Sequence, residues 1–484
     1  MPRPPPRPAP RLSSTPADND QVVVGILFKA GVDLSRVLVP PRRGPPGGAA
    51  TGAGSALRKA IELLEAQGFR VSGVGLRTLS VRGAVKAFRA AFGAELEARS
   101  DAPDRWGRLD LKAKGIQWSR FALLANVVEA IEIQRPFRFL DATSTPAPSA
   151  TPPVLATPVM NVRGEVSSLI RGQGQGREMG KGGGVPVAMV DSGFDCRHGF
   201  FTSKGLQVKV RLAEWASNEK TDPDGHGTAM CANFLAVAPE ADLVGVKLLN
   251  DEDPSVSATA LEGIQRAVRL RPRPWVVSMS KAIDLKGASV DGDCLILKGE
   301  IEAHANHPDP AKRIVFVFSA GNDGDFGFPA QMPDVIAVGG VFSDRSGGTA
   351  RVADFSSAFT SNAFPGRTVP DVSGVLGLWP DKTDLMLPVP SASAWDVDRS
   401  PADGTSSADG WAVFGGTSAT APQVAAVCAL LLEKHPDLSP DDIKQLLMSS
   451  AIAVLDGSGA VDGDAGAGVV NAAAALKLAK VVFP

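Results

Sequence analysis

The sequence predicts an α/β protein in two parts: a C-terminal domain built on a parallel sheet with helices on both faces, and a small ferredoxin-like α+β domain before it. Short apolar runs alternate with helical patterns after residue 184, which is typical of a parallel sheet. Within residues 21–140, strand and helix patterns follow one another as β-α-β-β-α-β, which indicates a split βαβ unit. A stretch rich in Pro, Ser and Thr separates the two parts.

Composition excludes several classes of protein. The chain has 484 residues, enough for two or three domains. Its net charge of −2 provides no positive electrostatic potential that would attract nucleic acid or an anionic membrane. No apolar stretch reaches the roughly 18 residues that a membrane span needs. The four cysteines are far apart, so no disulfide framework is expected. The apolar run at 22–28 fits a strand better than a signal sequence, and we expect a cytoplasmic protein, with export by an unrecognised route left open.

The N-terminal third is expected to form an independent domain over residues 21–140, after a Pro- and Arg-rich lead at 1–20. Its predicted elements are strands at 21–29, 69–75, 76–81 and 131–133, and helices at 55–67, 83–92 and 121–130. Residues 141–165 lack hydrophobic periodicity and predict an extended linker, a natural place for proteolytic nicking.

The third region, residues 166–484, is expected to form the sheet domain. Its predicted strands lie at 185–190, 243–248, 275–279, 314–318 and 335–338, and the helices between them at 226–235, 258–270 and 294–306. Polar residues follow two of these strands directly, Asp191 after the first and Asn322 after the fourth. Because sites in such sheets gather at the carboxyl ends of strands, these side chains are candidates for function.

Three residues at predicted element ends have the types that nucleophilic catalysis needs: Asp191, His226 and Ser418. A serine hydroxyl is a weak nucleophile until a base takes its proton, and histidine is the side chain whose pKa best suits that task. A carboxylate fixes the imidazole tautomer and stabilises the imidazolium. Ser418 precedes an apolar helical run, so free backbone N–H groups and the helix dipole favour negative charge beside it. The Asn322 amide and the Ser418 N–H are candidate donors to an oxyanion.

The chain resembles the subtilisin-like serine peptidases from about Val185 to its C-terminus. Four segments carry the resemblance, in the family's order: Val187–Gly193 around the aspartate, Gly225-His226-Gly227-Thr228, Ser319-Ala320-Gly321-Asn322, and Gly416–Pro422 around the serine. The resemblance implies a three-layer α/β/α domain that hydrolyses peptide or protein substrates through an acyl-enzyme. It also implies that Ser280, Lys281, Ala282, Ser319, Ala320 and Gly321 bind substrate backbone.

The sequence departs from the family at three places. The substrate-binding strand, usually Ser-Leu-Gly in the family, reads Ser280-Lys281-Ala282 here. The family often binds calcium through an aspartate near Phe200 and a loop after the His226 helix, and here the aspartate is absent and the loop too short. No metal or other cofactor is therefore predicted; Asp456, Asp462 and Asp464 are candidate calcium ligands, but a Gly/Asp turn explains them more simply. The stretch 376–411 is longer than the family needs and predicts either a lid over the cleft or a surface excursion.

The N-terminal domain resembles the activation pro-domain of sedolisin peptidases. The resemblance is carried by Gly68–Val71, Leu79–Gly83, Ala91-Phe92-Gly93 and Leu123–Ile133. It implies a precursor in which the chain's own N-terminal domain inhibits the catalytic domain. Two alternatives stay open: a non-catalytic binding protein on the same scaffold, and a sedolisin-type carboxyl peptidase, which would have Glu where His226 stands.

Overall fold

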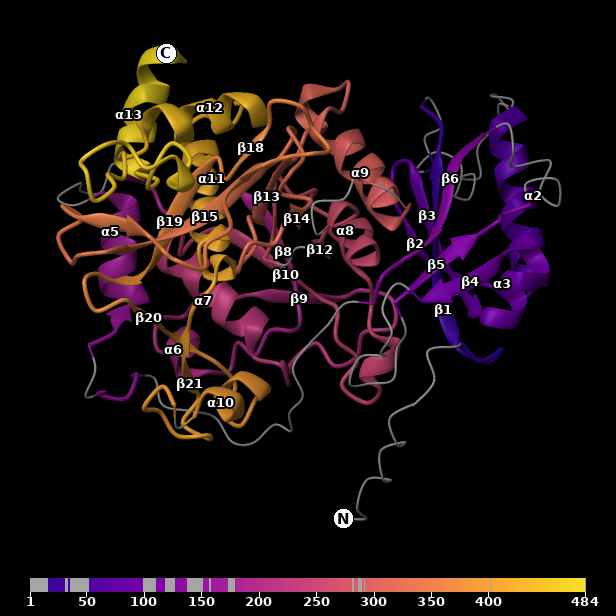
Figure 1. The fold of residues 1–484 in the computed structure, drawn as a ribbon, viewed down its shortest axis with the longest axis horizontal. Helices are drawn as coiled ribbons and strands as arrows, with labels where there is room; N and C mark the ends of the chain where they lie inside the picture. Colours follow the sequence, from indigo (N-terminus) through magenta and orange to yellow (C-terminus); the bar gives the residue numbers. More distant parts are fainter. Residues whose placement is uncertain are drawn as a thin grey trace.

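A computed structural model describes residues 16–30, 34, 52–98, 110–117, 127–136, 151–155, 158–172, 179–280, 283–285, 290, 292–400 and 402–483. Figure 1 shows a small N-terminal unit packed against one side of a larger domain, with helices α8 (Ala260–Val268) and α9 (Gly292–Ala305) at the junction. No helix among the described residues has both the length and the apolar character needed to cross a bilayer.

The N-terminal unit is a four-stranded antiparallel sheet in the order β2-β3-β1-β6, the ferredoxin-like topology expected from the sequence. Its elements are β1 (Gln21–Phe28), α2 (Gly52–Ala66), β2 (Arg70–Val74), β3 (Thr78–Ala84), α3 (Val85–Phe92) and β6 (Val128–Ile133). A hairpin of β4 (Glu95–Ala98) and β5 (Leu111–Lys114) follows α3. Apolar residues from both helices and the sheet, such as Phe88 and Ile26, form its core.

The helix predicted at 121–130 is wrong at its end, because Val128–Ala130 belong to β6. Its first residues, 121–126, lie outside the described part of the chain. In β6 Ile131 and Ile133 are buried two residues apart, as in a strand, and Val128 is buried beyond a register shift opposite Leu27 and Phe28. The strand thus extends the predicted closing strand toward its N-terminal side.

The larger domain has a central sheet in the order β21-β20-β19-β15-β13-β11-β8-β10-β9, parallel from β9 to β19. Its parallel strands are β8 (Pro186–Asp191), β9 (Lys209–Leu212), β10 (Asp242–Lys247), β11 (Val276–Met279), β13 (Val315–Ser319), β15 (Ile336–Ser343) and β19 (Val372–Leu378). Helices α7 (His226–Val237) and α11 (Ala421–Lys434) pack in the core on one face, and α8 (Ala260–Val268) and α9 (Gly292–Ala305) in the core on the other. This is the three-layer α/β/α arrangement.

Smaller elements complete the domain. Helices α5 (Ser167–Arg171), α12 (Pro440–Ser450) and α13 (Ala472–Val482) join the α7–α11 face, and α6 spans Gly199–Thr202. Short strands are β7 (Met160–Asn161), β12 (Ile283–Asp284), β14 (Gly327–Phe328), β16 (Ala350–Val352), β17 (Phe359–Thr360) and β18 (Thr368–Val369). Helix starts follow local chemistry: Thr259 and Glu262 form a capping box on α8, and Ser439 and Asp442 form one on α12.

The stretch 376–411 is neither a simple lid nor a simple surface excursion. It completes β19 and then forms β20 (Thr383–Pro388), α10 (Ala394–Arg399) and the start of β21 (Trp411–Phe414), with β20 and β21 extending the sheet in antiparallel fashion. The connection carrying α10 returns to the start of α7, where Ala394 N and Trp395 N donate to the carbonyls of Pro223 and Asp224.

The N-terminal sheet docks on α8 and α9 through buried polar side chains. The Arg82 guanidinium donates both to the Glu262 carboxylate, at 3.0 and 2.8 Å, and to the carbonyls of Val256 and Ser257. Next to this pair, Ser80 Oγ and Thr78 Oγ1 bond to Gln265. A buried Arg–carboxylate pair with all of these partners fixes one orientation of the domain on α8.

A second anchor lies on α9. Glu300 is fully buried and accepts from the backbone N–H groups of Leu76 and Arg77 and from Thr78 Oγ1. His304 Nε2 lies 2.8 Å from the same carboxylate. These hydrogen bonds hold the pKa of Glu300 below its usual value despite the opposing effect of burial. The β2–β3 turn is therefore tied to α9 by charge-assisted hydrogen bonds.

Removal of the Arg82 side chain should loosen this docking. Arg82→Ala leaves Glu262 buried without its cation, which typically costs on the order of 3 kcal/mol or more. We expect faster amide hydrogen exchange across residues 70–84, measured by mass spectrometry of the full chain. Arg89→Ala is the matched control, because its ion pair with Asp18 is exposed and should change exchange there little. Equal exchange in wild type and Arg82→Ala would contradict the anchoring role.

Candidate active site

Asp191 and His226 lie side by side at the carboxyl edge of the sheet. Asp191 is the last residue of β8 and is fully buried, and His226 is the first residue of α7 and 3% exposed. His226 Nδ1 lies 2.8 Å from Asp191 Oδ1, so the carboxylate accepts from this ring nitrogen and leaves Nε2 as the nitrogen able to take a proton. The sequence placed these residues at element ends, and the fold brings them into contact.

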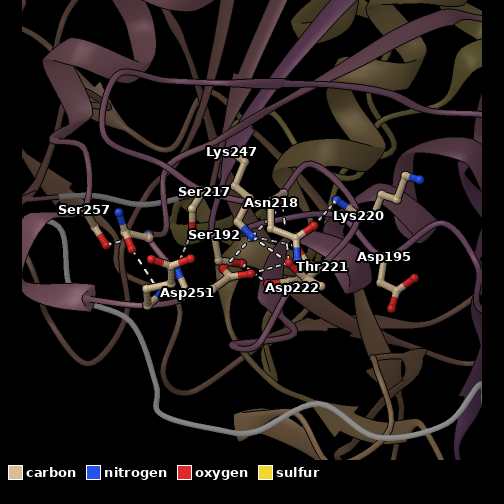
Figure 2. A network of polar contacts seen from close by, with 12 residues as sticks. Ser192, Asp195, Ser217, Asn218, Lys220, Thr221, Asp222, Lys247, Asp251 and Ser257 are labelled. Carbon is tan, nitrogen blue, oxygen red and sulfur yellow. Dashed lines mark hydrogen bonds and ion pairs between the residues drawn. The ribbon is translucent and has the colours of Figure 1, made fainter. Parts of the chain in front are cut away.

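A buried polar junction holds the end of β8 against the start of α7 (Figure 2). Ser192 Oγ donates to Asp222 Oδ1 and accepts from Gly227 N, while Asp222 Oδ2 accepts from both Thr228 N and Thr228 Oγ1. A Cβ on Gly227 would lie 2.2 Å from the Gly193 carbonyl oxygen, so only glycine fits at this crossing. The junction therefore fixes the distance between the end of β8, which carries Asp191, and the start of α7, which carries His226.

Lys247 supports the junction from the next strand. Its side chain is fully buried, and Nζ donates to Asp251 Oδ1 at 2.6 Å and to the carbonyls of Asn218 and Thr221, as Figure 2 shows. Burial lowers the pKa of this ammonium, and Asp251 opposes the shift. The ammonium thereby ties down the loop that leads into Asp222.

Ser418 lies in a 3₁₀ turn, Thr417–Ala419, directly before α11. This turn contacts α7, the helix that begins with His226. Ser418 Oγ donates to the Ser280 carbonyl at 2.7 Å, and no hydrogen bond joins it to His226, both residues being within the described part. A rotation about χ1 changes the partner of a serine hydroxyl at little cost, so the position, rather than this rotamer, defines the candidate nucleophile.

Asn322 follows β13 and reaches the same turn. Its Oδ1 accepts from Thr417 N at 2.9 Å and from Thr417 Oγ1 at 3.1 Å, which orients the amide. The amide nitrogen lies against Gly416, where a Cβ would be 3.3 Å from Nδ2. The amide nitrogen is thus held beside the turn that carries Ser418, where it is suited to donate a hydrogen bond to an oxyanion formed at Ser418.

The predicted substrate-binding residues fall into two groups. Ser280 is buried at the end of β11 with its carbonyl at Ser418, and Lys281 and Ala282 lie outside the described residues. Ser319 and Ala320 are buried, and the Gly321 carbonyl accepts from Thr417 Oγ1. The structure brings Ser280 and Gly321 to the turn of Ser418, and their contact with substrate stays a prediction.

The sequence did not single out Trp395 and Phe414. Both rings lie beside the imidazole of His226, with centroids 6.1 and 6.3 Å away. Phe414 is four residues before Ser418 and could have been suspected from that position, whereas nothing in the pattern of residues around Trp395 places it near His226.

Other candidates have structural partners. Among the described residues, no group of three or more His, Cys, Asp or Glu is arranged to hold a metal ion. Asp456 and Asp462 accept from backbone N–H groups of their own turns. His198, which also follows Asp191 in the sequence, bonds the Gly410 carbonyl through Nε2 at 2.8 Å, and burial lowers its pKa to about 4; it therefore packs against the end of the stretch 376–411.

Comparisons with known proteins identify the fold. The structure resembles that of fervidolysin from Fervidobacterium pennivorans, described as a keratinolytic enzyme related to subtilisin, with a TM-score of 0.56 at 19% identity over 95% of this chain and 61% of that chain. This likeness concerns the fold, including that of the N-terminal unit.

Sequence relatives point the same way. The chain is 29% identical to the serine protease AprX of Bacillus subtilis over 322 residues, which cover 60% of this chain and 66% of AprX. It is 26% identical to subtilisin E of the same organism over 56% of this chain and 61% of subtilisin E. The chain thus spans less than two thirds of each of these relatives. The family model described as the subtilase family matches residues 182–469, more than half of the chain, and the chain belongs to this family.

The junction makes a prediction about stability and pH. Burial, with Asp224 nearby, raises the pKa of Asp222 to about 6. Because the folded-state pKa lies above the unfolded value of about 3.9, the contribution of Asp222 to stability is fully present below pH 4 and is lost as the pH rises through 6. The free energy of unfolding of Asp222→Asn, measured in urea, should therefore rise relative to that of the wild type by on the order of 2–3 kcal/mol between pH 4 and pH 7. Parallel pH curves for the two proteins would show that Asp222 titrates normally.

Proposed function

We propose that the protein is a serine endopeptidase that cleaves peptide bonds through an acyl-enzyme. The observation that carries the proposal is the buried Asp191–His226 pair at 2.8 Å beside the turn that presents Ser418. In this proposal Ser418 is the nucleophile, His226 the base, Asp191 the group that orients the imidazole, and Asn322 the oxyanion donor. These groups suffice for acyl transfer, so we propose that no metal or cofactor takes part.

The proton follows a closed path in this mechanism. His226 Nε2 takes the proton of Ser418 Oγ as the oxygen attacks the substrate carbonyl, and Asp191 stabilises the imidazolium. The same proton passes to the leaving amine when the peptide bond breaks. Water then attacks the ester carbonyl and gives a proton to His226 Nε2, and His226 passes that proton to Ser418 Oγ as the ester bond breaks and the acid product leaves. The hydroxyl must first leave the Ser280 carbonyl, which is then free to accept from substrate backbone.

We further propose that the N-terminal domain inhibits the site in cis until the predicted linker at 141–165 is cut on the N-terminal side of Met160, where β7 joins the core of the larger domain. Support comes from the docking of its sheet on α8 and α9, which orients the domain through Arg82–Glu262 and Glu300. The non-catalytic scaffold is the second candidate, and the rotamer of Ser418, turned to Ser280, is the observation on its side.

Covalent labelling tests the nucleophile. A fluorophosphonate probe should label the wild type at Ser418 and should not label Ser418→Ala, because only an activated serine attacks the probe. Intact mass spectrometry of the same samples reports processing. We expect a cut within 141–165 in the wild type and a full-length chain in Ser418→Ala. Full-length chains in both would exclude self-cleavage, and failure to label the wild type would favour the scaffold.

A second variant tests the oxyanion donor. Asn322→Ala removes a hydrogen bond that forms only as charge develops, so kcat should fall by on the order of 10²- to 10³-fold while KM changes little. Steady-state kinetics on a chromogenic peptide measures both. A rise in KM larger than the fall in kcat would assign Asn322 to substrate binding instead.

A further inference from the structure

A pair of aromatic rings forms a wall beside His226. Trp395 of α10 and Phe414 of β21 stack with centroids 4.2 Å apart and planes 18° apart. Phe414 is 1% exposed, whereas Trp395 is only partly buried, so the part of this wall that solvent reaches belongs to Trp395. Trp395 belongs to the stretch 376–411, for which the sequence predicts either a lid or a surface excursion, and Phe414 follows that stretch.

Trp395 is held in place from several sides. Arg399, one turn later on α10, lies with its guanidinium carbon 4.7 Å from the Trp395 ring centroid. The backbone N–H of Trp395 donates to the Asp224 carbonyl, two residues before His226. Asp396 Oδ2 accepts from Ala392 N and Gly410 N, which closes the loop around α10. With Phe414 and Arg399 covering its faces, Trp395 presents an edge of the indole ring.

The chemistry of acyl transfer decides which half of a substrate meets this edge. His226 gives its proton to the leaving amine, so that nitrogen must lie at the imidazole. The acyl half lies on the other side of Ser418, where the Ser280 carbonyl accepts a hydrogen bond and Asn322 faces the turn. Rings that flank the imidazole from α10 and β21 therefore border the path of the leaving half.

We propose that Trp395 is a specificity-determining residue for the first residues after the cut, and that it favours large apolar or aromatic side chains there. The proposal rests on the proposed peptidase function. A large apolar or aromatic side chain that packs on the indole edge removes apolar surface of both groups from water, whereas glycine leaves the edge exposed to solvent. Pocket contacts of this kind change relative rates by about tenfold or more.

Acyl transfer to added amines tests this half of the site alone. A small activated ester first acylates Ser418, and the ester bond to Oγ is then broken by water or by an amino acid amide. The amine nitrogen forms the new amide bond, and its proton returns through His226 to Ser418 Oγ. The measured quantity is the partition between the two products with phenylalanine amide and with glycine amide. We expect wild type to prefer phenylalanine amide, and Trp395→Ala to lower that preference about tenfold.

Two further variants keep the test interpretable. Trp395→Phe should retain most of the preference, because a ring remains. Trp379→Ala is the matched control: this tryptophan also lies under an arginine, Arg351, with the guanidinium carbon 5.7 Å from its ring centroid. Within the described part of the chain its ring makes no ring contact with His226, unlike that of Trp395, so the wild-type preference should persist. An unchanged preference in Trp395→Ala, or none in wild type, overturns the assignment. A wild type that does not hydrolyse the ester at all overturns the peptidase proposal itself.

Discussion

The crossing of α7 over the end of β8 is the constraint on which the site depends. Gly227 meets the Gly193 carbonyl without room for a side chain, and Asp222 ties Ser192 to Thr228 across the same gap. A hydrogen bond of 2.8 Å between Asp191 and His226 requires that these two backbone ends stay within a few tenths of an ångström of one position. Rigid packing of polar groups achieves this better than an apolar contact, which has no preferred direction.

Buried charge is used here at a cost in stability. Lys247 and Asp222 are both removed from water, and such groups are often no more stabilising than apolar residues of the same size. Their benefit is directional, since each hydrogen bond specifies one arrangement of the loop at 217–222. The same logic applies to Arg82 and Glu262 where the N-terminal sheet meets α8: the pair selects one docking geometry among the many that an apolar face would accept.

The parts of the site that could be predicted lie where short-range rules apply. Asp191, His226, Asn322 and Ser418 each follow a strand or begin a helix, and the topology of a parallel sheet brings such ends together. Trp395 could not be predicted, because its place beside His226 follows from a loop of α10 back to α7 that no periodic pattern encodes. The helix expected at 121–130 failed at its end, where Val128–Ala130 pair with β1 through an irregular register that gives no regular burial period. The Ser418–Ser280 hydrogen bond depends on a rotamer, which a sequence does not specify.

The docked N-terminal domain and the catalytic junction share one polar chain. Arg82 donates to the Ser257 carbonyl and lies over the Trp215 ring, with its guanidinium carbon 5.2 Å from the centroid. Ser257 Oγ accepts from Asn250 N, and Asn250 Nδ2 donates to the Trp215 carbonyl. One residue on, Asp251 pairs with Lys247, whose ammonium holds the loop that ends at Asp222. The polar contacts that orient the docked domain and those that hold the loop before Asp222 are therefore continuous through Ser257, Asn250 and Asp251.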